Sequence, residues 1–303
     1  MKNPLVSVRI LTYNSSKYIS DTLDSVYNQT YQNIELIISD DCSTDSTVEI
    51  CKAWLENHAK RFANVKFLTT PVNTGVCANS KRSLEATTGD WIKGLGGDDC
   101  LCPEAIERFV KFVQKEKCQI CVAKIGYIDE DGKPITIRHG VTHTSYLSYT
   151  KLSYKEQFNV CKLRVFVPGP SLFYSRKIYQ ITGGPDARYG TSDEWSFLYK
   201  VFKNGFKIYG FDDTLIFYRV RKSSITHGNN QNKIASYVKN NELFYKEVIR
   251  PDLVDNKEYL LLFHHLISRL QRNKSLKFLN LLDPFWYKYS FMYSFQSRFR
   301  KIE

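Results

Sequence analysis

The 303-residue chain lacks the features by which several protein classes are identified from sequence. No apolar run reaches the roughly 18 to 20 residues that a membrane-spanning helix needs. The N-terminus, M-K-N-P-L-V-S-V-R-I, has no apolar signal core, which argues against secretion and for a cytoplasmic protein. No G-x-G-x-x-G follows the first strand-like run and no G-x-x-x-x-G-K-[ST] occurs, so the fingerprints of dinucleotide-binding and P-loop proteins are missing.

Disulfides and a zinc site also have little support. The eight cysteines are scattered, and a chain of this length does not need disulfide bonds to fold. Cys100-Leu-Cys102 and Cys118-Gln-Ile-Cys121 have spacings found in zinc sites, but neither is accompanied by a second C-x-x-C or by paired histidines. Reduced thiols are the favoured interpretation, and zinc is the alternative.

The net charge of +12 favours an anionic partner, such as a phosphorylated small molecule, an acidic membrane face or nucleic acid. A nucleic-acid-binding protein is therefore a rival hypothesis. However, the aromatic and basic motifs of the known modules are missing, and the paired aspartates described below would repel phosphates unless a metal ion lay between them. We predict no nucleic-acid partner.

Strand-like and helix-like segments alternate through the first half of the chain. Short apolar runs predict strands at residues 6–11, 34–38, 65–68 and 91–95. Two stripes at helical spacing lie between them: Ile19, Thr22, Leu23 and Val26 with Ser15 or Ser16 as cap, and Val48, Cys51 and Leu55 with Ser43 or Thr44 as cap. This alternation predicts right-handed βαβ units and an α/β fold with a mostly parallel sheet.

The pattern changes from about residue 125. Residues 127–132 read as a turn between strands, and residues 165–174 as an extended segment broken by prolines. A helix is predicted at residues 195–203, ended by Asn204-Gly205, and residues 231–303 look helical.

Polar residues follow three of the predicted strands. Thr12-Tyr13-Asn14, Asp40-Asp41 and Asp98-Asp99 each come directly after a strand-like run. In parallel α/β sheets, ligands bind outside the carboxyl ends of the strands. Adjacent carboxylates there can hold a divalent cation that bridges substrate phosphates, or one can accept a proton. A Gly-Asp turn that caps the helix starting near Pro103-Glu104 is the alternative for Asp98 and Asp99.

These segments resemble the family 2 glycosyltransferases. The likeness begins with T-Y-N, N-Q-T-Y, N-I-E-L-I-I and D-D-C-S-T-D, and continues through N-T-G-V-C-A-N-S-K-R and G-G-D-D. It resumes at G-G-P-D, S-D-E-W-S-F-L-Y-K and F-Y-R-V-R-K-S-S-I-T, in the family's order and spacing, and spans about residues 4–226.

The resemblance implies a GT-A fold and an inverting transfer of a sugar from a nucleotide-diphosphate sugar to a hydroxyl of a glycan or lipid-linked saccharide. A UDP-sugar is the donor it favours. It implies a catalytic domain at 1–228, with a nucleotide-binding half at 1–100 and an acceptor-binding half at 101–228, followed by a helical extension at 229–303. A divalent cation, Mn²⁺ or Mg²⁺, is the implied cofactor, and polysaccharide biosynthesis is the implied setting. An inactive glycosyltransferase-like scaffold and a nucleotidyltransferase are the alternatives.

The resemblance assigns the family's site residues to the positions of this chain that match its motifs. Asp99 is expected on the metal and Asp98 toward the ribose or the metal. The nucleotide-binding set is Thr12, Tyr13, Asn14, Asp41, Asn79, Arg82 and Asp98, with Asp41 on the base. Either Lys81 or Arg82 would face the diphosphate, in place of the family's frequent A-R-N.

The catalytic base is expected in the acid pair before Trp195. The family's usual order is Glu-Asp with the second residue as base, whereas this chain has Asp193-Glu194. The spacing from Trp195 to Gly205 aligns Glu194 with the base, and Asp193 is the alternative. A purely structural charge at a helix N-terminus would explain the pair as well.

Two further departures concern the metal site. Gly96 stands where the commonest form, D-x-D-D, has its first acid, and Arg221 stands where many members have the histidine of Y-R-x-H. Arginine has no free lone pair, so Arg221 can contact phosphate but cannot bind a metal.

The segment 285–301 is rich in aromatic and basic residues. At helical spacing, Phe291, Met292, Phe295 and Phe299 fall on one face, and serines, Arg298 and Lys301 fall on another. Such a helix can lie in an anionic membrane interface, here the inner face of the cytoplasmic membrane. Packing against the catalytic domain is the alternative.

Overall fold

The four strands predicted in the first half of the chain lie side by side at one end of a sheet. The computed structural model describes residues 3–136, 143–190, 193–221 and 231–270. The strands β1 (Val6–Thr12), β2 (Ile34–Asp40), β3 (Asn64–Leu68) and β4 (Trp91–Gly96) are parallel and pair in the order β3-β2-β1-β4. Every residue of β2 is buried, as expected for a parallel strand covered on both faces. The predicted parallel sheet is confirmed for this half.

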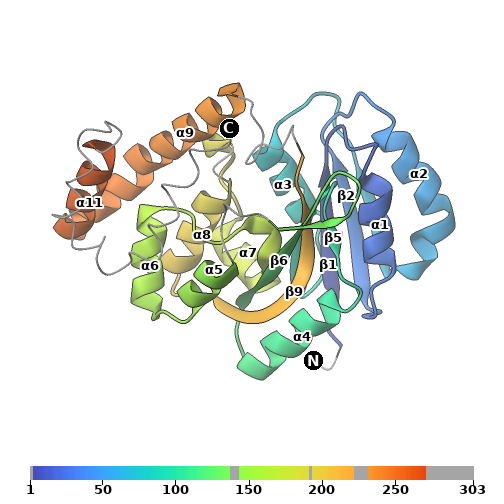
Figure 1. Ribbon diagram of the computed structural model, residues 1–303, viewed down its shortest axis with the longest axis horizontal. Helices are drawn as coiled ribbons and strands as arrows, with labels where there is room; N and C mark the ends of the chain where they lie inside the picture. Colours follow the sequence, from blue (N-terminus) through green and yellow to red (C-terminus); the bar gives the residue numbers. More distant parts are fainter. Residues whose placement is uncertain (1–2, 137–142, 191–192, 222–230, 271–303) are drawn as a thin grey trace.

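The sheet continues with mixed pairing. Its further strands are β5 (Cys100–Leu101), β6 (Ile120–Ile128), β7 (Pro134–Ile135), β8 (Leu172–Ser175) and β9 (Tyr209–Arg219). β8 is antiparallel to both β4 and β6, and β6 is parallel to β9. β5 pairs with β9, which brings the chain just after β4 against the end of β9. In Figure 1, β9 bends strongly, so the sheet curls.

Helices cover both faces of the sheet. Those of the first half are α1 (Ile19–Tyr27), α2 (Thr47–His58), α3 (Val76–Glu85), α4 (Ala105–Glu116) and the short 3₁₀ turn η1 (Ala59–Arg61). The stripe predicted for α1 is fully buried, whereas α2 buries Thr47, Cys51 and Trp54.

The predicted helix caps are wrong. No side chain caps α1 or α2, because the serines expected there bond elsewhere in the loops. The Ser15 hydroxyl donates to the Tyr13 carbonyl, and the Ser43 hydroxyl donates to the Asp40 carboxylate.

The second half supplies further helices around the later strands. They are α5 (His143–Thr150), α6 (Tyr154–Leu163), α7 (Arg176–Thr182), α8 (Asp193–Lys203) and the 3₁₀ turns η2 (Gly169–Ser171) and η3 (Ala187–Tyr189). The turn predicted at 127–132 links β6 to β7, and the helix predicted at 195–203 is α8. Their aromatic side chains pack with Leu84 of α3 and Ile92 of β4 into one core cluster.

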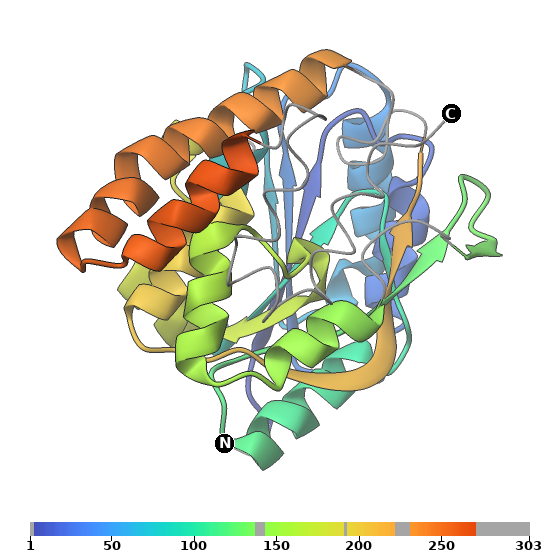
Figure 2. The ribbon, with the colours of Figure 1, turned by 60° about the vertical axis from the view of Figure 1, so that its left-hand side comes forward.

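The C-terminal helices lie at the opposite end of the molecule from α1 and α2 (Figures 1 and 2). They are α9 (Gln231–Phe244), the π-helical turn η4 (Tyr245–Ile249), α10 (Arg250–Asp255) and α11 (Tyr259–Leu270). Lys162 of α6, almost fully buried, anchors them: its Nζ lies 2.5 Å from Glu258 and 3.8 Å from Asp252. Helix is thus confirmed for 231–255 and 259–270, while 285–301 lies outside the described residues. Among the residues described, no helix has the length and apolarity to cross a membrane.

Candidate functional site

The three polar segments predicted to share one edge of the sheet do so. Thr12 of β1 is in register with Asp40 of β2, and Leu11 with Gly96 of β4. Backbone hydrogen bonds join the loops beyond the strands: the Asp41 N–H donates to the Thr12 carbonyl at 3.0 Å, and the Gly97 N–H to the Leu11 carbonyl at 2.8 Å. Hydroxyl, amide and carboxylate groups therefore converge at the carboxyl ends of β1, β2 and β4.

Asp41 is buried and held by several donors. Its carboxylate accepts the N–H groups of Thr74 and Gly75 at 3.1 and 2.7 Å, the Thr74 hydroxyl at 2.5 Å and the Arg82 guanidinium at 3.0 Å. Burial alone would raise the pKa of Asp41, but these hydrogen bonds outweigh it and lower the pKa below its usual value. Asp41 therefore carries a fixed negative charge at neutral pH.

Arg82 and Asn79 of α3 support Asp41. Besides Asp41, the Arg82 guanidinium donates to the Asn79 side-chain oxygen at 2.9 Å. Asn79 is itself buried against Ser39 of β2, whose hydroxyl donates to it at 2.6 Å. Arg82 thus lies on the Asp41 carboxylate in this structure, and its predicted contact with a diphosphate stays a prediction.

The segment after β1 offers a hydroxyl and a ring. The Thr12 hydroxyl is buried and has no hydrogen-bond partner among the residues described. Asn14 adopts a left-handed conformation with φ 49°, and its side-chain oxygen accepts the Thr44 N–H at 2.8 Å. This turn leaves the Tyr13 ring half exposed beside the strand ends, where it can stack on a planar base.

Asp98 and Asp99 form an acidic pair in which Asp99 is buried and Asp98 is partly exposed. The Asp99 carboxylate accepts the Arg219 N–H at 3.0 Å, and the Asp98 carboxylate pairs with the Arg221 guanidinium at 2.7 Å. Burial raises the pKa of both groups, and for Asp99 the charge of Asp98 raises it further. A cation at this place would relieve that repulsion.

The structure explains why Gly96 stands where an acid is common. A Cβ atom on Gly96 would lie 2.8 Å from an Asp98 oxygen and 3.1 Å from an Asp99 oxygen. Both carboxylates therefore turn toward the space that the missing side chain leaves. A side chain at position 96 would collide with the two carboxylates, so this arrangement of the pair needs glycine there.

Arg219 is a residue of the candidate site that the sequence analysis did not single out. Its side chain is fully buried, donates to the Asp98 carbonyl at 2.9 Å and pairs with Asp21 of α1 at 2.8 Å. Arg219 and Arg221 both lie over the Tyr18 ring, with guanidinium carbons 5.0 and 5.4 Å from its centroid. Two fixed cations thus stand beside the acidic pair, which suits an anionic ligand.

The donor set at the acidic pair fits Mg²⁺ or Mn²⁺, which take oxygen ligands and are often held by one or two carboxylates plus substrate phosphates and water. No group of three or more His, Cys, Asp or Glu side chains close enough for a metal occurs in the described part of the chain. A cation at Asp98 and Asp99 would therefore need ligands from its substrate.

Glu194 lies in the first turn of α8. Its Oε1 atom accepts the Gly169 N–H at 2.9 Å. The helix is anchored next to it, because the buried Trp195 ring donates its Nε1–H to the Cys161 carbonyl at 2.6 Å. Asp193 begins the same helix, but its side chain lies outside the described residues.

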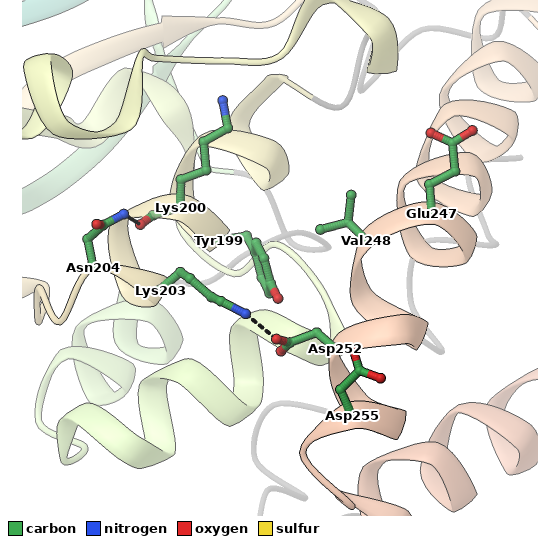
Figure 3. Close-up of a pocket in the computed structure, with 8 residues that line it drawn as sticks. All are labelled: Tyr199, Lys200, Lys203, Asn204, Glu247, Val248, Asp252 and Asp255. Atoms are coloured by element: carbon green, nitrogen blue, oxygen red, sulfur yellow. Dashed lines mark hydrogen bonds and ion pairs between the residues drawn. The ribbon is translucent and has the colours of Figure 1, made fainter.

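A separate open pocket of about 390 Å³ lies between α8 and the C-terminal helices (Figure 3). Its lining residues are Tyr199, Lys200, Lys203, Asn204, Glu247, Val248, Asp252 and Asp255. Lys203 pairs with Asp252 across it. None of the residues predicted from sequence lines this pocket. Two of its other charged groups bond outside it: Lys200 donates to the Gly184 carbonyl, and Glu247 accepts the Tyr189 hydroxyl.

Sequence comparison matches residues 7–182, more than half of the chain, to the family described as glycosyl transferase family 2. An uncharacterized glycosyltransferase of Haemophilus influenzae is 32% identical over 165 residues, which cover 54% of this chain and 63% of that protein. The chondroitin synthase of Escherichia coli is 35% identical over 134 residues, covering 44% of this chain and 19% of the synthase. The chain thus spans less than two thirds of the length of these relatives.

Structure comparison finds TarS of S. aureus. A crystal structure of its residues 1–349 in complex with UDP-GlcNAc superposes with a TM-score of 0.56 at 16% sequence identity, covering 88% of this chain and 81% of that chain. The complex with UDP gives a TM-score of 0.57, also at 16% identity, covering 82% and 74%. At this identity the likeness concerns the fold.

Proposed function

Because the chain belongs to the family 2 glycosyltransferases and has the GT-A fold, we propose that it transfers a sugar from a UDP-sugar to a hydroxyl group of a glycan or lipid-linked saccharide. The observation that carries this proposal is the convergence of Thr12, Asp41 and the Asp98–Asp99 pair at neighbouring strand ends. That edge is where parallel α/β sheets bind nucleotides.

The donor is assigned to residues 1–100 of a catalytic domain that ends near residue 228. Asp41 would accept the single N–H of the uracil base, and Tyr13 would stack on that base. Thr12 and Asn14 would line the same site. Asn79 and Arg82 would support Asp41 from behind. The complexes of TarS with UDP and UDP-GlcNAc support a uridine nucleotide. Residues 101–228 would bind the acceptor, and the relatives that make polysaccharide support a glycan there.

The leaving diphosphate would be stabilised at the end of β4. Asp99, with Asp98, would hold Mn²⁺ or Mg²⁺, which supplies positive charge to the diphosphate oxygens when bound. Arg221, paired with Asp98, would donate to the same phosphates, since a guanidinium suits phosphate oxygens. This charge favours departure of UDP.

Glu194 would be the base of a single inverting displacement. Its carboxylate takes the proton of the acceptor hydroxyl, whose oxygen bonds to the anomeric carbon. The bond from that carbon to the diphosphate breaks on the opposite side, and its electron pair leaves with UDP. No covalent enzyme intermediate is required. Asp193 is the second candidate for this role.

The test is a panel of nucleotide sugars, measured for binding by calorimetry and for hydrolysis, with Mn²⁺, Mg²⁺ or EDTA. We expect one uridine donor to bind with a cation and to be hydrolysed slowly without acceptor. Binding of no donor by a folded protein would overturn the proposal and favour an inactive scaffold.

We further propose a peripheral membrane contact at the C-terminal end, through residues 285–301 and α11. In support, α11 exposes an apolar stripe: Leu260 is 61% exposed and Leu266 53%, with Phe263 between them. Together with the basic and aromatic composition of residues 285–301, this stripe would suit an anionic lipid surface on the inner face of the cytoplasmic membrane.

Vesicle sedimentation tests this contact. The full chain should sediment with vesicles containing anionic phosphatidylglycerol and stay in solution with neutral ones. Leu260→Ser with Leu266→Ser should weaken sedimentation several-fold, whereas Val238→Ser, an equally apolar exposed residue of α9, should not. Dimers in light scattering that the double variant abolishes, without lipid binding, would contradict the membrane contact.

A further inference from the structure

A tight turn joins the expected base to the centre of the sheet. The turn is η2, Gly169–Ser171, and it lies between two side chains from distant parts of the sequence. Glu194 accepts the Gly169 N–H at 2.9 Å, and the Lys93 ammonium donates to the carbonyl of Pro170, the next residue. Glu194 is thus connected through two neighbouring residues of the turn, Gly169 and Pro170, to β4, the strand that ends at the acidic pair.

Gly169 is required by close approach. A Cβ atom built on it would lie only 2.2 Å from Glu194 Oε1 and 2.9 Å from Glu194 Cδ. These atoms are the end of a flexible side chain, so an added methyl group would displace the carboxylate and leave the backbone in place. The identity of residue 169 therefore sets where the carboxylate can lie.

The turn itself is rigid. Gly169 stands between Pro168 and Pro170, whose rings fix φ and reduce the freedom of the chain. The N–H and hydroxyl of Ser171 both donate to the Pro168 carbonyl, at 3.0 and 2.6 Å. Beyond the turn the chain enters β8, which is paired on both sides. Rigid support of this kind can fix a side chain accurately.

Lys93 is an unusual residue for its place. It lies on β4 with no exposed surface, and its Nζ lies 5.7 Å from the centroid of the Phe109 ring. Burial lowers the pKa of its ammonium group to about 7. An apolar residue would fill this core position without the free-energy cost of burying an ammonium group. Packing alone therefore does not explain why a lysine stands here and bonds to the Pro170 carbonyl.

We propose that Lys93 and Gly169 are positioning residues for Glu194. Lys93 holds the turn against β4, and Gly169 leaves the space in which its own N–H orients the carboxylate toward the acceptor hydroxyl. This inference rests on the proposed role of Glu194 as base.

The first variant is Gly169→Ala. We expect kcat to fall about 10²-fold, as for a base displaced by about 1 Å, with the donor Kd changed by less than about threefold. Glu194→Asp shortens the side chain by one methylene and makes room for the methyl group. In that background Gly169→Ala should therefore cost much less than in the wild type.

The second variant is Lys93→Met, which keeps an unbranched side chain one atom shorter and removes the donor. It should lower kcat at least about tenfold with little change in the donor Kd, and Lys93→Arg should recover part of the loss. The matched control is Lys66→Met, because Lys66 of β3 also donates to a backbone carbonyl, that of Ala86 at 2.6 Å, away from Glu194. Its kcat should be unchanged.

Glu194→Gln is measured in the same assay, to separate an error in the positioning role from an error in the assignment of Glu194 as the base. If it loses turnover while Gly169→Ala and Lys93→Met keep the wild-type kcat, the positioning role is wrong and the proposed base stands. If Glu194→Gln keeps turnover, the base and the positioning role are both wrong. A lower melting temperature with an unchanged kcat would also overturn the inference.

Discussion

Replacing Glu194 by glutamine is expected to reduce turnover about 10²- to 10⁴-fold, the usual contribution of a general base. Glutamine has the same size, and its side-chain oxygen can still accept the Gly169 N–H that holds Glu194. It cannot take a proton from the acceptor hydroxyl. Donor binding should therefore stay within a few-fold of the wild type, and release of UDP in the presence of acceptor is the quantity to measure.

Glu85→Gln is the matched control, since Glu85 is an exposed carboxylate of α3 whose ion pair with Lys81 spans 3.9 Å. It should have wild-type turnover. Undiminished turnover in Glu194→Gln would contradict the assignment and transfer the role to Asp193, which Asp193→Asn then tests. The two residues are neighbours at the start of α8, so only the chemistry of each variant can separate them.

The strands and the meeting of their polar ends were predictable because they depend on local pattern and simple topology. β1, β2 and β4 are short apolar runs with turn residues after them, and parallel strands must end at the same edge. The helix caps were not predictable, because Ser15 and Ser43 have bonding partners in their own loops that compete with capping.

The contacts that complete the site join residues far apart in the sequence. Arg219 reaches Asp98 from the end of β9, and Lys93 of β4 reaches Pro170 in the turn before the neighbouring strand β8. Neither contact leaves a periodic signal, and each depends on how β4, β8 and β9 are packed. Arg82 shows the same limit, because its position in the sequence allows a contact with phosphate, while the fold places it on Asp41.

Replacing Asp99 by asparagine is expected to weaken donor binding at least about tenfold, or about 1.4 kcal/mol, and to remove its dependence on Mn²⁺. Asparagine keeps an oxygen that can accept the Arg219 N–H but loses the charge that would bind the cation. Calorimetric titration of the donor with Mn²⁺ and with EDTA measures both effects. Equal affinities with and without metal in the wild type would contradict a metal role for Asp99.

Asp90→Asn separates loss of function from loss of structure. Asp90 lies just before the other end of β4 and accepts the Leu5 N–H at 3.0 Å. Its replacement should lower the melting temperature and leave the donor affinity unchanged. Asp99→Asn should show the reverse pattern.

The stability of the metal-free protein provides a second, independent measure. The pKa of Asp99 is raised in the folded state by burial and by Asp98, so ionisation of Asp99 disfavours folding. Its cost is absent below the unfolded-state pKa and grows as the pH rises above it. In EDTA at neutral pH, Asp99→Asn should therefore melt at the same or a higher temperature than the wild type. With Mn²⁺ and donor the order should invert, because only the wild type gains stability from binding them. A carboxylate that lowers the melting temperature of the metal-free protein and raises that of the protein with Mn²⁺ and donor has a position suited to binding them.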